Sequence, residues 1–311
     1  LGYLDPGYFA AGSVTLDPDL ARAAIMKTIA QPLGLTEAEA ALGIHRVLNA
    51  QMAEGIRAVT VRRGHDPRGF TLVALGGAGP LHAIALAEEL GIRRVLVPPH
   101  PGVLSAQGLL DARVEHEVTM AFSHDLDELT LAKLSQAYQG IDIQAETLMA
   151  REGIEASNCK VQHHADVCFV GQSYYLSVPV DLLGADPLAA IYEAFLETHN
   201  QINGHRFEAP AKIVNLRTVH LAAKPGAVKD AAGPIDGGDM EKARRVVHMP
   251  GDTGSREVPI LDRTEMAAGQ MVSGPAIIEQ ADTTTLLTSQ WRARVAPSLT
   301  LILEQIGDGA P

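Results

Sequence analysis

The chain has 311 residues, of which 46% are apolar, 20% are charged and 4% are aromatic, and its formal net charge is −12. This length allows two domains with sizeable cores, and the acidic balance argues against nucleic acid or an anionic membrane as the main partner. Cys159 and Cys168 are the only cysteines, which is typical of reduced, structural thiols in a chain of this size. No signal peptide or long apolar span is visible, so cytoplasm is the default expectation.

The chain begins with a Gly- and Pro-rich stretch over residues 1–14 that predicts an irregular lead-in. Asp17-Pro18 places a cap before a proline at the first helical position, which predicts a helix to about residue 30. Thr36 to Glu39 has the capping-box pattern and opens a long helix that runs to about Val61. We expect the buried stripe of this helix to consist of Ile44, Leu48, Met52, Ile56 and Val59.

The stretch from Thr71 to Val97 is the most informative part of the sequence. Thr71–Leu75 is a short apolar run, as expected of a strand covered on both faces. A glycine-rich turn follows at residues 76–79, and Pro80 and Gly91 suit the start and end of a helix. With a second strand at Arg94–Val97, the pattern predicts a β–glycine turn–α–β unit of a parallel sheet.

The turn at residues 76–79 has two interpretations on local grounds. Bare N–H groups and the positive end of the helix dipole make it a candidate contact for an anion or a nucleotide. The turn is neither the G-x-G-x-x-G fingerprint nor a Walker A loop, so a purely structural packing role is an equal alternative.

The remaining elements follow in order. A short helix at 105–110, an alternating strand at 114–120 and an amphipathic helix at 126–152 are expected. Val161–Val170 and Tyr174–Val180 read as a hairpin, Pro187 opens a helix, and residues 224–238 predict a loop or linker. Closely spaced strands then follow at Arg245–His248, Val258–Leu261, Ala276–Gln280, Thr283–Leu287 and Leu299–Glu304. We place one domain at 1–124 and a β-rich domain with its connecting helix at 125–311.

The histidines and hydroxyl groups give little direct indication of chemistry. The sequence has no H-E-x-x-H or paired C-x-x-C spacing, so no metal site is predicted. His82, after the glycine turn, and His100, between two prolines, either donate to a phosphate or serve as structural imidazoles. Ser105 lacks a nucleophile elbow, and Asp282 to Thr285 is interpreted as a structural β-turn.

Four motifs resemble the hydantoinase A/5-oxoprolinase family, and they occur in the family's order: Arg62–Pro67, Gly76–Ala83, Val97–Val103 and Gly274–Glu279. The resemblance covers nearly the whole chain but only the C-terminal portion of a family member. It implies an α/β fold class, with part of an actin-like (ribonuclease H-like) ATPase domain followed by a β-rich α+β C-terminal domain.

The resemblance also implies where a nucleotide binds. In the family the turn after this strand is the adenosine-side loop, a role that Gly76, Gly77, Ala78 and Gly79 would inherit. The preceding helix of actin-like ATPases often contacts the base or ribose, so Glu54 and Arg57 are candidate ligands. They lie three residues apart on one helix face, and a solvated ion pair is the alternative.

The activity implied by the resemblance is ATP-dependent hydrolysis of a cyclic amide, with ATP and Mg²⁺ as cofactors and a hetero-oligomer as the working form. The implied partners are the N-terminal part of the same ATPase subunit, a B-type hydantoinase subunit and the cyclic amide. No catalytic residue is identified, and without the family's phosphate loops the chain alone is not expected to turn over. The alternatives are the smaller subunit of an acetone or acetophenone carboxylase, a non-catalytic assembly module, and a sugar-kinase-like enzyme.

Overall fold

The computed structural model describes residues 1–223 and 239–307, so the loop predicted at 224–238 lies outside the described residues. Contacts between residues divide the chain into two units. The first unit contains Leu1–Val61, Asp66–Gly108 and the described residues from 239 onward, and the second contains Arg62–His65 and the described residues from Leu109 to 223. Within the described ranges, no helix has the length and apolar character needed to cross a membrane.

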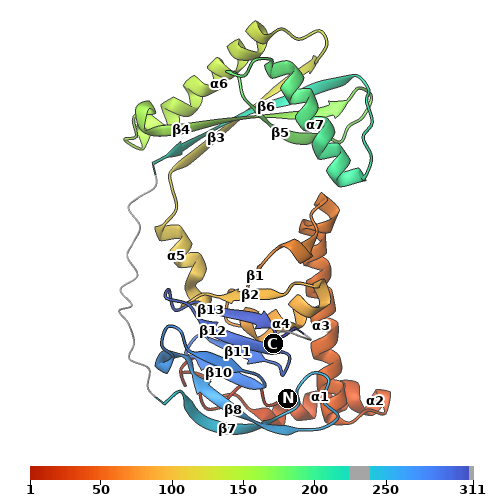
Figure 1. The fold of residues 1–311 in the computed structure, drawn as a ribbon, viewed down its shortest axis with the longest axis vertical. Helices are drawn as coiled ribbons and strands as arrows, with labels where there is room; N and C mark the ends of the chain where they lie inside the picture. The colour runs from red at the N-terminus through yellow and green to blue at the C-terminus, as the bar shows by residue number, and fades with distance from the viewer. Residues whose placement is uncertain (224–238, 308–311) are drawn as a thin grey trace. The chain divides into compact units, whose positions relative to one another are not determined.

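The first unit is built on two sheets. Their strand orders are β1–β2–β13–β12–β9 and β11–β10–β8–β7 (Figure 1). The strands are β1 (Leu72–Val73), β2 (Arg94–Val97), β7 (Glu241–Val247), β8 (Arg256–Asp262), β9 (Met271–Ser273), β10 (Ala276–Gln280), β11 (Thr283–Leu287), β12 (Trp291–Val295) and β13 (Leu301–Gln305). The helices are α1 (Pro18–Ile25), α2 (Gln31–Leu33), α3 (Glu37–Val59), α4 (Gly79–Leu90) and α5 (Leu104–Leu110), which begins in this unit.

The predicted β–glycine turn–α–β unit is confirmed. Strands β1 and β2 pair in parallel, with Leu72 opposite Val95, and α4 connects them. Pro80 occupies the first turn of α4, and Gly91 ends the helix in the left-handed conformation at φ +69°. Strand β1 is shorter than the run at 71–75 suggested, because only two of its residues pair with β2.

Helix α3 begins as predicted but buries a different face. The side chain of Thr36 accepts from the Glu39 amide and the Glu39 carboxylate reaches back, which completes the capping box. The predicted buried stripe was wrong: Ile44, Leu48 and Val59 are exposed, and Met52 and Ile56 are only partly buried. The buried residues of α3 are instead Ala40, His45, Asn49 and Ala53.

The division into units is discontinuous in the sequence. The predicted boundary lay between residues 124 and 125, with the C-terminal strands in a second domain. In the structure β13 pairs with β2, placing Leu301 opposite Val97, and Trp291 donates its Nε1–H to the Glu88 carboxylate over 2.8 Å. The last strands therefore complete the sheet that β1 and β2 begin, and the first unit contains both ends of the described chain.

The second unit is a single antiparallel sheet covered by two helices. The sheet has the order β3–β6–β4–β5, and α6 and α7 lie on the same face of it (Figure 1). The predicted hairpin is confirmed, because β4 and β5 pair antiparallel. The elements are β3 (Glu115–Asp125), α6 (Leu131–Arg151), β4 (Cys159–Phe169), β5 (Leu176–Val180), α7 (Pro187–Asn203) and β6 (Ala211–Ala222).

Candidate nucleotide site

The glycine turn connects the end of β1 to the start of α4. Gly76 has φ +81°, which favours glycine, and its N–H donates to the Pro101 carbonyl oxygen over 2.7 Å. The backbone then enters α4 at Gly79. One amide of the turn is therefore used to fix its conformation.

The next three amides of the turn are available to a ligand. Within the described residues, the N–H groups of Gly77, Ala78 and Gly79 have no hydrogen-bond partner. Gly77 and Ala78 are also exposed. Unpartnered amides at the start of a helix carry the positive end of its dipole, so this turn can bind a polar or anionic group.

The turn between β10 and β11 contacts both the glycine turn and the loop that contains Gly102. Thr283 donates its hydroxyl hydrogen to the Gly77 carbonyl oxygen over 2.9 Å. The Asp282 carboxylate accepts the Gly102 N–H over 2.8 Å. A Cβ atom on Gly102 would lie only 2.5 Å from that carboxylate, so a side chain at this position would displace Asp282. The sequence predicted only a structural β-turn at Asp282 to Thr285 and did not predict the hydrogen bond from Thr283 to Gly77.

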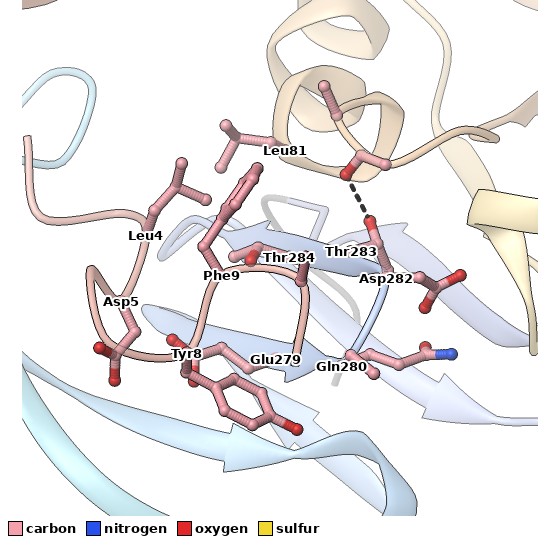
Figure 2. Close-up of a pocket in the computed structure, with 14 residues that line it drawn as sticks. Leu4, Asp5, Tyr8, Phe9, Leu81, Glu279, Gln280, Asp282, Thr283 and Thr284 are labelled. Atoms are coloured by element: carbon pink, nitrogen blue, oxygen red, sulfur yellow. Dashed lines mark hydrogen bonds between the residues drawn. The ribbon is translucent and has the colours of Figure 1, made fainter. Parts of the chain in front are cut away.

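A cavity of about 260 Å³ opens beside the glycine turn. Three segments of the chain line it: the lead-in from Leu4 to Ala10, the α4 start at Gly77, Ala78 and Leu81, and residues 279–284. Leu4, Phe9 and Leu81 point toward the same side of the cavity, and Glu279 and Tyr8 lie at the other (Figure 2). The cavity thus has an apolar side and a polar side, and no Lys or Arg among the described residues lines it.

A buried ionic cluster fixes the lead-in segment against this cavity. The Glu279 side chain is 2% exposed, and its two oxygens lie 2.7 Å from Lys242 Nζ and 2.9 Å from Arg245 Nη2. These are ion-pair distances, although neither approach has hydrogen-bond geometry. Arg245 also pairs with Asp5 at 3.1 Å, and Lys242 lies 4.1 Å from the ring centroid of Tyr8.

His82 belongs to a polar cluster between α3 and α4. Its Nδ1–H donates to Asn49 Oδ1 over 2.9 Å, and Asn49 Nδ2 donates to His45 Nδ1 over 3.1 Å. The two imidazole rings stack with centroids 5.1 Å apart. Burial lowers the pKa of both histidines, and for His45 the nearby His82 lowers it further. In the described chain His82 is thus held in a structural contact and does not line the cavity.

Glu54 and Arg57 are not brought to the glycine turn. Arg57 donates to Glu54 over 2.6 Å and to the carboxylate and carbonyl oxygens of Glu89 over 3.1 Å each. Glu89 lies in the last turn of α4, whereas the glycine turn precedes its first turn. A helix rises about 1.5 Å per residue, so the length of α4 separates this pair from the cavity. The arrangement is the ion pair that the sequence offered as the alternative.

A second polar cluster, which sequence analysis missed, lies in the second unit. Asp142 on α6 accepts from Thr218 over 2.6 Å, from His163 over 3.0 Å and from His220 over 3.2 Å. Burial alone would raise the pKa of Asp142, but these three donors together hold it below its ordinary value. No set of three His, Cys, Asp or Glu residues in the part of the chain that the structure describes is arranged to hold a metal ion.

The chain is similar to several known proteins over most of its length. Residues 1–118 match the family model described as hydantoinase/oxoprolinase. The chain is 32% identical to the caprolactamase subunit alpha of Pseudomonas jessenii over 308 residues, covering 96% of the chain and 44% of that protein. It is 27% identical to the acetone carboxylase beta subunit of Xanthobacter autotrophicus, covering 91% of the chain and 42% of that protein.

A solved structure supports the same relationship. The crystal structure of the ATP-dependent caprolactamase from Pseudomonas jessenii superposes with a TM-score of 0.88 and 30% sequence identity. The match covers 97% of the present chain and 45% of the caprolactamase chain. The predicted fold class, part of an actin-like ATPase domain with a β-rich α+β domain, is confirmed at this level. The chain spans less than half the length of these proteins.

Proposed function

This chain belongs to the hydantoinase/oxoprolinase family, and from that premise we propose that it forms the adenosine side of the nucleotide site in an ATP-dependent amide hydrolase subunit. One observation carries the proposal: the unpartnered amides of Gly77, Ala78 and Gly79 lie beside a partly apolar cavity. The apolar side chains would contact the base, and the amides would donate to the ribose or the adjacent phosphate.

The size and charge of the cavity match only part of a nucleotide. At about 260 Å³ it is smaller than the roughly 300–1,000 Å³ typical of whole drug-sized ligands, so it suits the nucleoside. Phosphoryl transfer needs cationic or N–H groups and Mg²⁺ at the β- and γ-phosphates, whereas Asp5, Glu279 and Asp282 line this cavity. We therefore assign Mg²⁺ and the phosphate loops to the N-terminal part of the same ATPase subunit.

The proposed reaction consumes ATP at the amide. Transfer of the γ-phosphoryl group from ATP to the amide oxygen would release ADP and give an imidate phosphate. Water would then add to the carbon, and the C–N bond would break to free the amine and leave an acyl phosphate. A second water would hydrolyse the acyl phosphate to the carboxylate and phosphate. A B-type partner subunit would complete ring opening of a small cyclic amide, in the cytoplasm. The hydrolase is favoured over a carboxylase subunit because identity is 32% to the caprolactamase subunit and 27% to the acetone carboxylase subunit.

Nucleotide binding by an Ala78→Phe variant tests the proposal. Calorimetric titration with Mg·ATP and ADP should show at least about tenfold weaker binding than for the unchanged chain, because the new ring fills the cavity beside the amides. The matched control is Ala156→Phe, at another exposed alanine that begins a short helical turn. Each variant is measured twice, once as the 311-residue chain alone and once fused to the proposed N-terminal part.

The same titration separates the nucleotide site from an assembly module. Unchanged nucleotide affinity in Ala78→Phe, with an unchanged unfolding midpoint, contradicts the proposed site. A different outcome favours the assembly module, in which the turn serves only packing. In that case Ala78→Phe destabilises the fold, but the protein that remains folded binds nucleotide with unchanged affinity.

A further inference from the structure

The sheet that contains β1 ends at an apolar edge with no strand beside it. Strand β1 is the first strand of the order β1–β2–β13–β12–β9, and within the described residues no strand pairs with its other side (Figure 1). The run Thr71–Leu75 predicts a strand covered on both faces, yet Val73 is 45% exposed and Leu75 is 50% exposed. An exposed apolar edge is a template for another strand, and folded proteins normally cover it.

The backbone groups of this edge are free to pair. The Ala74 N–H donates to the Leu96 carbonyl oxygen of β2 over 2.9 Å. Because neighbouring residues of a strand direct their N–H groups to opposite sides, the N–H of Val73 points away from β2. The Leu75 N–H has no hydrogen-bond partner in the part of the chain that the structure describes. A strand that approached this edge would therefore find unused donors.

Helices α3 and α4 lie side by side and run in the same direction. Asn49 of α3 is bonded to His82 near the start of α4, and Arg57 is bonded to Glu89 near its end. Met52 of α3 packs against the core cluster that contains the buried residues of α4. Helix α4 connects β1 to β2, and α3 leads into β1. This is the arrangement of successive β–α–β units on one face of a parallel sheet.

This arrangement calls for a strand beyond β1. Crossovers between parallel strands are right-handed, so successive units on one face of a sheet advance in one direction. Since β2 is reached from β1 through α4, β1 is reached through α3 from a strand on its open side. Packed helices are about 8–10 Å apart and paired strands about 4.8 Å apart, so α3 is displaced from α4 by about two strand positions. No strand precedes α3 within the described residues.

The outward face of α3 has the apolar composition that such a strand requires. Its exposed residues Ile44, Val47, Leu48 and Val59 are between 40% and 59% exposed, and Gly55 lies on the same side of the helix. A Cβ atom on Gly55 would meet nothing within 4 Å, although glycine in a helix interior is less stable than alanine. The missing side chain lets another segment approach α3 closely.

We propose that the sheet continues past β1 in the working subunit, where a strand of the N-terminal part pairs in parallel with β1 and packs against the outward face of α3. More than half of the caprolactamase subunit alpha lies outside its match to the chain, which is ample length for such a strand. A second copy of the chain offers, in its described residues, no strand that leads into α3. The identity of the occupant rests on the proposed function, which assigns the phosphate loops to this same N-terminal part.

Amide hydrogen exchange tests the paired edge in two proteins, the 311-residue chain and the same chain fused to the N-terminal part. The Val73 amide should exchange at least about tenfold more slowly in the fusion. The Ala74 amide is the internal control, because its bond to Leu96 protects it in both proteins. Equal exchange of Val73 in the two proteins would overturn the proposal. Protection of Val73 that is already present in the 311-residue chain and disappears on dilution would assign the edge to a second copy and also contradict it.

Charged substitutions on α3 test the second half of the contact. Val47→Glu and Leu48→Glu replace exposed residues, so the urea midpoint of the 311-residue chain should stay unchanged. In the fusion each should speed exchange of the Val73 amide by about tenfold or more, because a carboxylate would be buried against the added strand. Ile143→Glu, at a residue of α6 that is 57% exposed, is the matched control. An equal effect of Val47→Glu and Ile143→Glu would show that α3 does not cover the strand.

Titration of the fusion with Mg·ATP distinguishes failure of this inference from failure of the proposed function. A fusion that protects Val73 but binds no nucleotide refutes the proposed function alone. A fusion that binds nucleotide but leaves Val73 unprotected refutes this inference alone.

Discussion

Thr283 donates a hydrogen bond of 2.9 Å to the carbonyl oxygen of Gly77, although the two residues are 206 positions apart. The Thr283 side chain is buried, and it lies where β11 begins. With Gly76 held by Pro101 on the other side, this bond fixes the peptide plane that orients the amides of the turn. The conformation of the proposed nucleotide contact therefore depends on the C-terminal strands.

Replacement of Thr283 tests that dependence. Thr283→Val keeps the shape but removes the donor, so it should lower the free energy of unfolding by about 1 kcal/mol and weaken Mg·ATP binding. Thr283→Ser retains a hydroxyl and should restore most of the affinity. Urea unfolding and calorimetry measure the two effects. Nucleotide affinity that is equal in the Val and Ser variants would show that the bond does not orient the turn.

Glu279→Gln tests the buried ionic cluster. The change leaves Lys242 and Arg245 without the carboxylate that lies 2.7 and 2.9 Å away. Because Arg245 keeps its pair with Asp5 and Lys242 is partly exposed, only the two ion-pair contacts of Glu279 are lost, and we expect a loss of about 2 kcal/mol in the free energy of unfolding. Glu193→Gln, at the exposed pair with Arg206, is the control and should leave the urea midpoint unchanged. Equal effects of the two substitutions would contradict the prediction.

Asp142→Asn tests the acid sensitivity of the second unit. The folded-state pKa of Asp142 is held below the ordinary value of 3.8, so its carboxylate contributes stability above that pH and loses the contribution as pH falls below it. The Asn variant should be less stable by about 1–2 kcal/mol at pH 7, and the difference from the unchanged chain should shrink toward pH 3. Urea unfolding across this pH range measures it.

The exposed Asp127 provides the control for this pH dependence. Asp127→Asn should show no comparable difference at any pH. A gap between Asp142→Asn and the unchanged chain that stays constant down to pH 3 would mean that the three donors do not stabilise the ionised carboxylate.

Arg57→Gln tests the role of the helix that precedes the glycine turn. Arg57 is bonded to Glu54 and Glu89 away from the cavity, so the substitution should leave Mg·ATP affinity unchanged within about twofold, which is under 0.5 kcal/mol. Ala78→Phe is the positive comparison in the same titration. A large loss of affinity in Arg57→Gln would return Arg57 and Glu54 to the set of nucleotide ligands.

Several local features could be predicted because their causes lie within a few residues. The capping box at Thr36 and Glu39, the left-handed end of α4 at Gly91 and the β–turn–α–β unit all follow from backbone geometry and hydrogen bonding between near neighbours. The buried face of α3 could not be predicted in this way. Its apolar spacing fits more than one stripe, and contact with α4 selects the face with Ala53 and Asn49, where Asn49 bonds to His82.

By itself the sequence determined the order of most helices and strands, the glycine turn and the family, because caps, periodicity and short motifs are written in consecutive residues. Only the tertiary structure decided that β13 completes the sheet of β2 and that Thr283 and Asp282 support the glycine turn. It also placed α3 in parallel beside α4. These contacts join residues far apart in the chain, and they form because pairing strand edges and burying apolar faces stabilises the fold as a whole.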